Sequence, residues 1–379
     1  MSLLLRMSVH SRFVIGLIAC LFGLALLGCS ENRGERSLTN YQERLLTVLE
    51  RLEGVDGFGM QIAEGLEASP DSAPMSGSNA LVPPFPKKSV VSAADRESSS
   101  SIDLLDFLGL YGCRLQEVVA QANSSLGKFA PNSQRLLSAL KFIELGPECV
   151  ESLIENDKAS LASAVSAEVN YKQSQVHWFV AKALFEGEEY RSFWDKPLQL
   201  GGYPKQLSSE PMMALSKVGQ LLKAWSAGEA SKGVSDIEGQ LFLIAQGDGG
   251  ALVKAYEILN RELQASNQIL DHAIRSRTLC KQPNAYSRDI LSNVVEKFFV
   301  GEVQAWASAL NRRQYAIMAA VRPLEQVMKQ DLSKDYFSWK ERRDALFVNA
   351  TEQIKAHVQR LKILLEPDLL KESLVEYCY

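Results

Sequence analysis

The residues of this chain that could hold a charged group form two polar clusters. The first spans residues 123–128, reads Asn-Ser-Ser-Leu-Gly-Lys, and has the ending of a phosphate-binding loop. The pattern is incomplete, because Ala122 stands where the loop needs its first glycine and Phe129 where it needs Ser or Thr. A helical pattern also precedes it in place of a strand. We therefore predict a polar hairpin loop whose side chains bond to exposed backbone groups. Its candidates for binding an anion or a partner's main chain are Asn123, Ser124, Ser125 and Lys128.

The second cluster is Asn311-Arg312-Arg313, which follows Trp306. Two guanidiniums beside an aromatic ring could hold a carboxylate, or the phosphate of a ligand or lipid headgroup. On a helix, however, neighbouring side chains point about 100° apart. The ordinary alternative is that one arginine pairs with an acid while the other is solvated.

Residue types and spacings typical of catalysis are missing from the rest of the chain. His177, His272 and His357 have no second histidine or carboxylate at the spacing of a helical metal site, so we expect them on the surface or at its rim. No Gly-x-Ser-x-Gly motif is present. The sequence therefore predicts no catalytic residue, no metal site and no cofactor.

The N-terminus carries one cysteine in a distinctive setting. Arg6 and Arg12 precede an apolar run over residues 13–27, and Gly28 stands directly before Cys29. The run is shorter than the roughly 20 residues that cross a bilayer, and a plain secretory signal favours an Ala-x-Ala cleavage site. The pattern resembles the lipobox of bacterial lipoproteins. That resemblance implies cleavage between Gly28 and Cys29, acylation of Cys29, and a membrane partner through that lipid. Since Ser30 is not aspartate, it also implies an outer-membrane lipoprotein facing the periplasm.

Four cysteines remain after Cys20 is removed with the signal and Cys29 is acylated. They are Cys113, Cys149, Cys280 and Cys378, an even number in an oxidising compartment. Three pairings are possible. Two predicted helices flank Pro131, midway between Cys113 and Cys149, so an antiparallel hairpin would favour that pair and leave Cys280 with Cys378. Four buried thiols are the alternative.

Composition indicates a folded body, since 46% of the residues are apolar and 23% are charged. Without residues 1–28 the chain has 41 − 2 = 39 basic and 45 acidic residues, a net charge of −6. A chain without a basic excess lacks the electrostatic footprint of nucleic-acid binding. We therefore expect no nucleic-acid partner.

Composition and periodicity divide the chain into an N-terminal region, a linker and a body. Residues 29–53 combine the lipid anchor with a short amphipathic helix over 40–52. Residues 54–100 are rich in Ser, Pro and Gly and predict a disordered tether that lets the body stand off the membrane. Within them, Pro-Pro-Phe-Pro at 83–86 favours a stiff spacer or a strap on the body over a docking peptide.

Residues 101–379 predict an all-α, antiparallel multi-helix bundle, with a possible break between two helical subdomains near 195–210. Apolar residues recur at helical spacing between residues 104 and 122, 252 and 273, and 347 and 365. Asn132 could cap a helix that ends at Gly146-Pro147, and Asp248 a helix that begins after Gly247. Residues 287–330 are also helical in pattern, and Gly301 is a candidate kink.

Several short segments are similar to a bacterial lipoprotein family, the domain of unknown function 3080. They are Leu104–Leu108, Tyr111–Cys113, Asn123–Lys128, Arg135–Leu137, Gly247–Ala251, Lys297–Phe299, Val303–Trp306 and Leu310–Arg313. The likeness covers most of residues 37–330. Residues 60–100 fall outside it, because this segment is longer and richer in serine than the family's connector. The resemblance implies the lipoprotein class and no particular activity.

These observations favour a non-catalytic binding or scaffold protein of the bacterial cell envelope, with an envelope protein as partner. The alternative is an envelope enzyme or small-ligand carrier with a site between helices near Arg312. A deep polar pocket converging on Arg312, Asn311 or residues 123–128 would favour that alternative.

Overall fold

The structure is a computed structural model that describes residues 33–53, 81–87, 90–92, 104–205, 208–275 and 285–366. Its first helices are α2 (Arg33–Glu53), α4 (Leu104–Gly109), α5 (Leu115–Asn123), α6 (Ser125–Lys128), α7 (Asn132–Glu155), α8 (Ala159–Ser174), α9 (Val176–Phe185) and α10 (Glu188–Trp194). The others are α11 (Glu210–Ser226), the 3₁₀ helix η2 (Val234–Asp236), α12 (Ile237–Ala245), α13 (Gly249–Arg275), α14 (Ala285–Val294), the π-helical η4 (Val295–Gln304), α15 (Ala305–Val327) and α16 (Lys334–Leu365). Extended pairing among these residues is limited to one isolated bridge, between Val91 and Leu332. The all-α prediction is confirmed.

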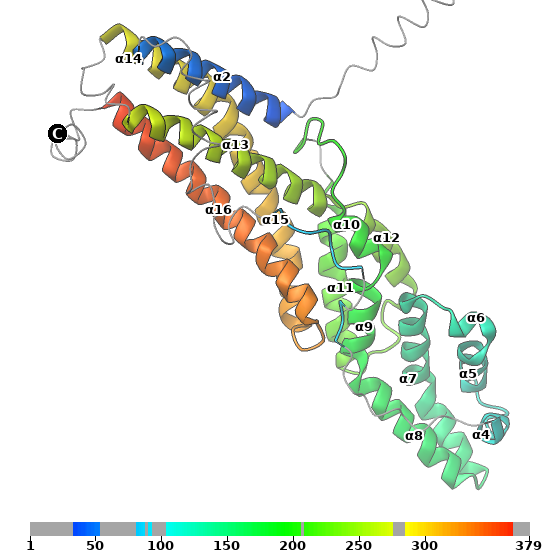
Figure 1. Cartoon of the computed structure of the whole chain (residues 1–379). Coiled ribbons are helices and arrows are strands. Elements are labelled where there is room, and N and C mark those ends of the chain that lie inside the picture. The colour runs from blue at the N-terminus through cyan, green and yellow to red at the C-terminus, as the bar shows by residue number, and fades with distance from the viewer. Residues whose placement is uncertain are drawn as a thin grey trace, which may run out of the picture.

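The helices form an elongated body in which the longest ones lie side by side at one end (Figure 1). Residue numbers on α13 and α16 rise together along their contact: Asn260 bonds to the carbonyl of Leu346, and Asp271 pairs with Arg360. These two helices are therefore parallel. The continuous run α14–η4–α15 returns beside them in the opposite direction, and Gly301 lies within its π-helical part. The predicted antiparallel arrangement holds for α15 with α16 and for α7 with α8.

Helix α2 is part of the main core and not an appendage before a tether. Its residues Leu38, Tyr41 and Leu45 are fully buried. The Tyr41 ring lies 5.5 Å from that of Phe299 in η4. The helix predicted over residues 40–52 is confirmed and extends back to Arg33. Helix α2 therefore packs within the main core, together with helices of the predicted body.

Residues 81–87 and 90–92, here called the strap, lie extended across the body and are seen as a thin cyan segment beside α10 in Figure 1. Val82, Phe85, Val90 and Val91 are buried in the main core. The Phe85 ring meets those of Trp339, Tyr190 and Tyr336 edge-on, at centroid distances of 4.9, 5.6 and 6.0 Å.

Backbone hydrogen bonds hold both ends of the strap. The amide of Val82 donates to Glu257 at 2.9 Å, and the amide of Ser333 donates to the carbonyl of Val90 at 2.9 Å. Of the two structures that the sequence favours for residues 83–86, a stiff spacer or a strap on the body, the buried Phe85 supports the strap. The linker predicted over 54–100 is wrong for residues 81–87 and 90–92, and its other residues lie outside the described ranges.

A buried chain of polar side chains ties α2 to α13 and α16. His357 is fully buried, its Nε2 lies 2.7 Å from Tyr41 Oη, and its Nδ1 lies 2.8 Å from Asn267 Oδ1. Because the Asn267 amide nitrogen donates to Gln353, its oxygen accepts; Nδ1 therefore carries the proton and Tyr41 donates to Nε2. Burial, with the charge of Arg360, lowers the pKa of His357 to about 3. The expectation of a surface histidine is wrong here, because His357 belongs to the core.

A second buried polar group lies under the strap. Arg343, which is fully buried, donates from Nη1 to Glu325 Oε1 at 2.7 Å, and Tyr336 Oη donates to the same oxygen at 2.7 Å. The Arg343 guanidinium lies 5.1 Å from the ring centroids of both Trp194 and Trp339. Hydrogen bonds and aromatic faces thus satisfy this charge within the core.

The far end of the body has a hydrophobic cluster of its own. Its buried members are Leu110, Leu115, Val118, Val119, Phe142, Cys149, Leu153, Ala162 and Val165. Residues 195–205 instead contribute Leu200 and Tyr203 to the main core. The structure therefore divides the core within the α7–α8 hairpin and not at the break predicted near 195–210.

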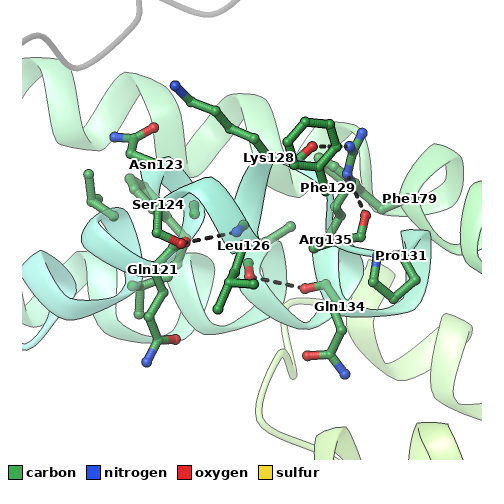
Figure 2. Close-up of a pocket in the computed structure, with 18 of the residues that line it drawn as sticks. Gln121, Asn123, Ser124, Leu126, Lys128, Phe129, Pro131, Gln134, Arg135 and Phe179 are labelled. Carbon is green, nitrogen blue, oxygen red and sulfur yellow. Dashed lines mark hydrogen bonds between the residues drawn. The ribbon is translucent and has the colours of Figure 1, made fainter.

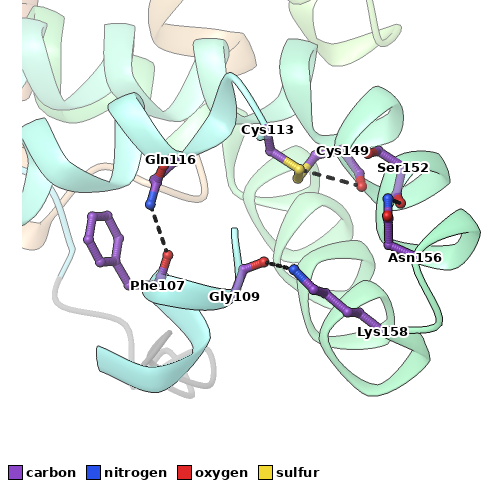
Figure 3. Close-up of a disulfide and its surroundings, with 8 residues drawn as sticks. All are labelled: Phe107, Gly109, Cys113, Gln116, Cys149, Ser152, Asn156 and Lys158. Atoms are coloured by element: carbon purple, nitrogen blue, oxygen red, sulfur yellow. Dashed lines mark hydrogen bonds between the residues drawn. A yellow bond between two sulfur atoms is a disulfide. The ribbon is translucent and has the colours of Figure 1, made fainter. Parts of the chain in front are cut away.

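A disulfide joins Cys113, just before α5, to Cys149 in α7, with the two Cα atoms 5.3 Å apart (Figure 3). Beside it, Lys158 Nζ donates to the carbonyl of Gly109 at 2.8 Å. The pairing of Cys113 with Cys149 is confirmed. Cys280 and Cys378 lie outside the described residues, as do Gly28 and Cys29. The disulfide fixes the α4–α5 segment against α7.

Two predicted helix boundaries near this disulfide differ from the structure. The helical pattern over 104–122 is interrupted between α4 and α5, where Gly112 has φ +95° and Tyr111 is 84% exposed. Helix α7 does not end at Gly146-Pro147 but continues through Pro147 to Glu155. A Cβ atom on Gly146 would lie 2.2 Å from Val169 Cγ2 in α8. This glycine therefore allows the close approach of two helices and is not a helix terminator.

Candidate functional site

The polar loop at residues 123–128 is a tight connection between α5 and α6. Ser124 is the N-cap of α6: its hydroxyl accepts from the amide of Gly127 at 3.0 Å and donates to the carbonyl of Gln121 at 2.7 Å. The amide of Lys128 donates to the carbonyl of Ser124 at 3.0 Å. Ser124 thus bonds to backbone groups of the loop, as predicted for a serine side chain of this segment. The loop does not offer Ser124 or these amides as an anion cradle.

Gly127 is required by a close backbone approach in this loop. A Cβ atom at that position would lie 2.1 Å from the carbonyl oxygen of Gln121. The glycine that resembled part of a phosphate-binding loop therefore has a structural role. Asn123, Ser125 and Lys128 are exposed on the surface of the same turn.

An arginine from α7 fixes the other side of the loop. Arg135 donates from Nη2 to the carbonyl of Lys128 at 2.9 Å and from Nε to the carbonyl of Ala130 at 3.1 Å (Figure 2). Sequence reasoning missed Arg135, because one arginine in a helical segment carries no signal of its target. Its role is to hold α6 and Phe129 in place.

A groove of about 930 Å³ lies between this loop and helices α7, α8 and α9. Its floor includes the buried side chains Val119 and Phe142 and the partly buried Phe179. At the rim, Leu126 is 87% exposed and Phe129 is 89% exposed. Of the predicted residues, Asn123, Ser124 and Lys128 line this groove and Ser125 does not. The groove is open and its floor is mainly apolar.

One buried carboxylate faces this groove from α8. Glu168 is 6% exposed, and its Oε1 accepts from Lys172 Nζ at 2.9 Å. The ammonium of Lys172 also lies 5.3 Å from the Phe142 ring centroid and 5.8 Å from that of Phe179. Glu168 Oε2 is buried and has no hydrogen-bond partner among the described residues. A buried acceptor left without a donor is costly, so a ligand that brings a donor to Oε2 would gain affinity.

The arginine pair of the second cluster is split between two environments. Arg313 Nε donates to Asp248 Oδ2 at 2.8 Å, its Nη2 donates to Asp248 Oδ1, and Tyr203 Oη donates to the same carboxylate at 2.9 Å. Burial, together with the Asp248 charge, raises the pKa of Tyr203 above its ordinary value. Arg313 therefore has a structural role as the partner of Asp248, the residue before α13, whereas Arg312 is exposed.

Asn311 and Arg312 line a separate surface pocket of about 540 Å³ with Tyr315 and Arg322. Among the described residues that line this pocket there is no histidine, cysteine, aspartate or glutamate. This pocket and the groove beside α6 share no lining residue, so the structure does not bring the two predicted clusters together.

The model of the family described as Protein of unknown function (DUF3080) matches residues 66–366. The chain belongs to the DUF3080 family. The match confirms the resemblance found in the sequence. It also includes residues 66–100, which we had expected to lie outside the likeness, whereas α2 precedes the part matched to DUF3080. No curated protein and no solved structure matches the chain.

Two further properties of this DUF3080 chain bear on its site. In the ranges that the structure describes, no helix has an apolar stretch long enough to span a bilayer. Over the same residues, no group of three or more His, Cys, Asp or Glu side chains is arranged to hold a metal ion.

Proposed function

We propose that this chain is an acylated lipoprotein of the bacterial cell envelope that binds an envelope protein through the groove beside α6. The lipoprotein class is supported by the basic and apolar segment that leads to Gly28-Cys29. Ser30 supports an outer-membrane position on the periplasmic side. The disulfide between Cys113 and Cys149 fits an oxidising compartment.

The groove beside α6 carries the binding proposal. Leu126 and Phe129 expose large apolar side chains next to an apolar floor, an arrangement typical of protein interaction sites. Arg135 holds their backbone in place, which lowers the conformational entropy that binding would cost. Glu168 Oε2 would accept a hydrogen bond from a donor of the partner. The partner is thus a protein segment that places an apolar side chain on Phe142 and a donor near Glu168.

In-cell photo-crosslinking tests this proposal. The photoreactive residue p-benzoylphenylalanine replaces Phe129 in one strain and Phe242 in another; Phe242 is a matched control because it is 64% exposed on α12. We expect one defined protein adduct from position 129 and none from position 242. Glu168→Gln should lower the yield at position 129 several-fold, because it removes the charged acceptor. Equal adducts at both positions, or a yield unaffected by Glu168→Gln, would contradict the proposal.

A small-ligand carrier is the second candidate, because the groove volume lies within the range of about 300–1,000 Å³ found for ligand pockets. Native mass spectrometry of the protein purified from envelopes tests it. A bound molecule should be present in the wild type and lost in Ala122→Trp, which places an indole in the groove from an exposed position. An enzyme near Arg312 has less support, since Arg313 is engaged by Asp248.

A further inference from the structure

The distance along the chain from Cys29 to the folded body is short. Helix α2 begins at Arg33, and its buried residues Leu38 and Tyr41 belong to the main core. Four residues of extended chain reach at most about 14 Å. An acyl group on Cys29 would therefore hold the N-terminal end of α2 close to the bilayer, with no long tether between them.

The segment beside that end of α2 is the loop from 195 to 205. The amide of Arg33 donates to the carbonyl of Gly201 at 3.1 Å, and Trp306 Nε1 donates to the carbonyl of Tyr203 at 2.9 Å. A Cβ atom on Gly34 would lie 2.1 Å from the Trp306 ring, so α2 packs directly on that side chain. Figure 1 shows the green loop after α10 reaching up to the start of α2. The loop and the N-terminal end of α2 thus lie side by side on the body.

Apolar side chains are exposed on this loop and on the strap next to it. Leu198 is 96% exposed, and Leu81 is 69% exposed. Lys196 Nζ donates to the carbonyl of Val82 at 2.6 Å, which joins the strap to the loop. Lys254 Nζ donates to the carbonyls of Pro197 and Leu198, the former at 2.7 Å. The leucine is therefore presented on a backbone that is held in position.

Exposed basic residues lie on both elements, Arg33 at the start of α2 and Lys205 at the end of the loop, while Asp195 is exposed at the start of the loop. Basic residues near a membrane surface are attracted to anionic headgroups by about 1 kcal/mol each. A single exposed leucine is ordinary on a soluble surface. Here it stands beside the segment that leads to Cys29.

We propose that this end of the body, formed by the first turn of α2, the loop 195–205 and Leu81, rests on the leaflet that holds the Cys29 acyl chains. Leu198 inserts among the headgroups, while Arg33 and Lys205 face the lipid phosphates. This inference rests on the proposed acylation. In this arrangement the body has a fixed orientation on the membrane, and its α5–α8 end points away from the bilayer.

Photo-crosslinking of the full-length chain in bacterial envelopes tests this orientation. p-Benzoylphenylalanine replaces Leu198, Leu81 or Leu108 in separate strains; Leu108 is the matched control, because it is 58% exposed on α4, at the α5–α8 end and outside the groove beside α6. Mass spectrometry of each purified chain measures phospholipid adducts and, on the N-terminal peptide, the acylation of Cys29. We expect several-fold more phospholipid adduct at positions 198 and 81 than at position 108.

The outcomes separate this inference from the function on which it rests. Acylated Cys29 with equal lipid adducts at 198 and 108, or with protein adducts alone at 198, overturns the membrane contact and leaves the lipoprotein assignment standing. Unmodified Cys29 with lipid adducts at 198 supports the contact and overturns the acylation. Unmodified Cys29 without lipid adducts at 198 overturns both.

Discussion

Replacing Phe85 by alanine should destabilise the body strongly, although the residue lies in a segment with the composition of a linker. Phe85 is 3% exposed, and its ring packs edge-on against three aromatic rings. Core Phe→Ala substitutions cost about 3–5 kcal/mol, and aromatic pairs contribute about 0.5–1.5 kcal/mol beyond their buried area. We expect Phe85→Ala to lower the free energy of unfolding by about 4 kcal/mol. The loss cannot exceed the free energy that holds the strap on the body, because a detached strap makes no further contacts that could be lost.

Urea unfolding followed by tryptophan fluorescence measures this change, since Trp339 and Trp194 both lie in the aromatic cluster. The matched control is Phe129→Ala, because Phe129 is 89% exposed and its loss should change stability by less than about 0.5 kcal/mol. Hydrogen exchange should also be faster in Phe85→Ala at the amides of Val82 and Val91, which bond to side chains of the body. If Phe85→Ala behaves like Phe129→Ala in both measurements, residues 81–87 and 90–92 form a linker and the packed strap is refuted.

Two further predictions concern the buried polar groups. Burial, with the charge of Arg360, lowers the pKa of His357 to about 3, so near pH 6.5 this histidine becomes protonated in the unfolded chain but not in the folded one. The free energy of unfolding should therefore fall as the pH drops below 6.5, by about 2 kcal/mol near pH 5. Urea titrations at several pH values should show that His357→Gln removes this part of the pH dependence; the same pH dependence in wild type and variant would contradict the prediction. Arg343→Met should cost about 3–5 kcal/mol because it leaves Glu325 buried without its cation, and the double variant Glu325→Leu/Arg343→Met should recover most of that loss. A double variant no more stable than Arg343→Met would show that the pair itself is not the cause.

The helical framework was predictable wherever buried positions are apolar. On α13 the predicted stripe from Leu252 to Ala273 is buried along its length, including Ser266. On α16 the predicted stripe was displaced, because the true buried face includes Arg343 and His357. In a sequence, a buried polar residue whose hydrogen-bond partner lies on another helix cannot be told from a surface residue. Hydrophobic periodicity alone therefore assigns it to the exposed face of its helix.

The candidate site was predictable only in part, for a related reason. Residues 123–128 were chosen for their polar side chains, and they do border the groove. Glu168 and Arg135 were missed, because nothing in their local pattern shows that one is buried and the other clamps a loop. Composition also misled at the strap: Pro and Ser around Phe85 suggested disorder, whereas the ring fills a gap made by helices far away in sequence.

The contact between Tyr41 and His357 joins residues 316 positions apart. Helix α2 therefore completes its contacts only after α16 has been synthesised, because it packs against α13, α14 and η4 and bonds to α16. Until these helices have been made, the apolar face of α2 is uncovered, and an incomplete chain would present that face to chaperones and proteases. Synthesis through α16 is thus a condition for the native packing of α2.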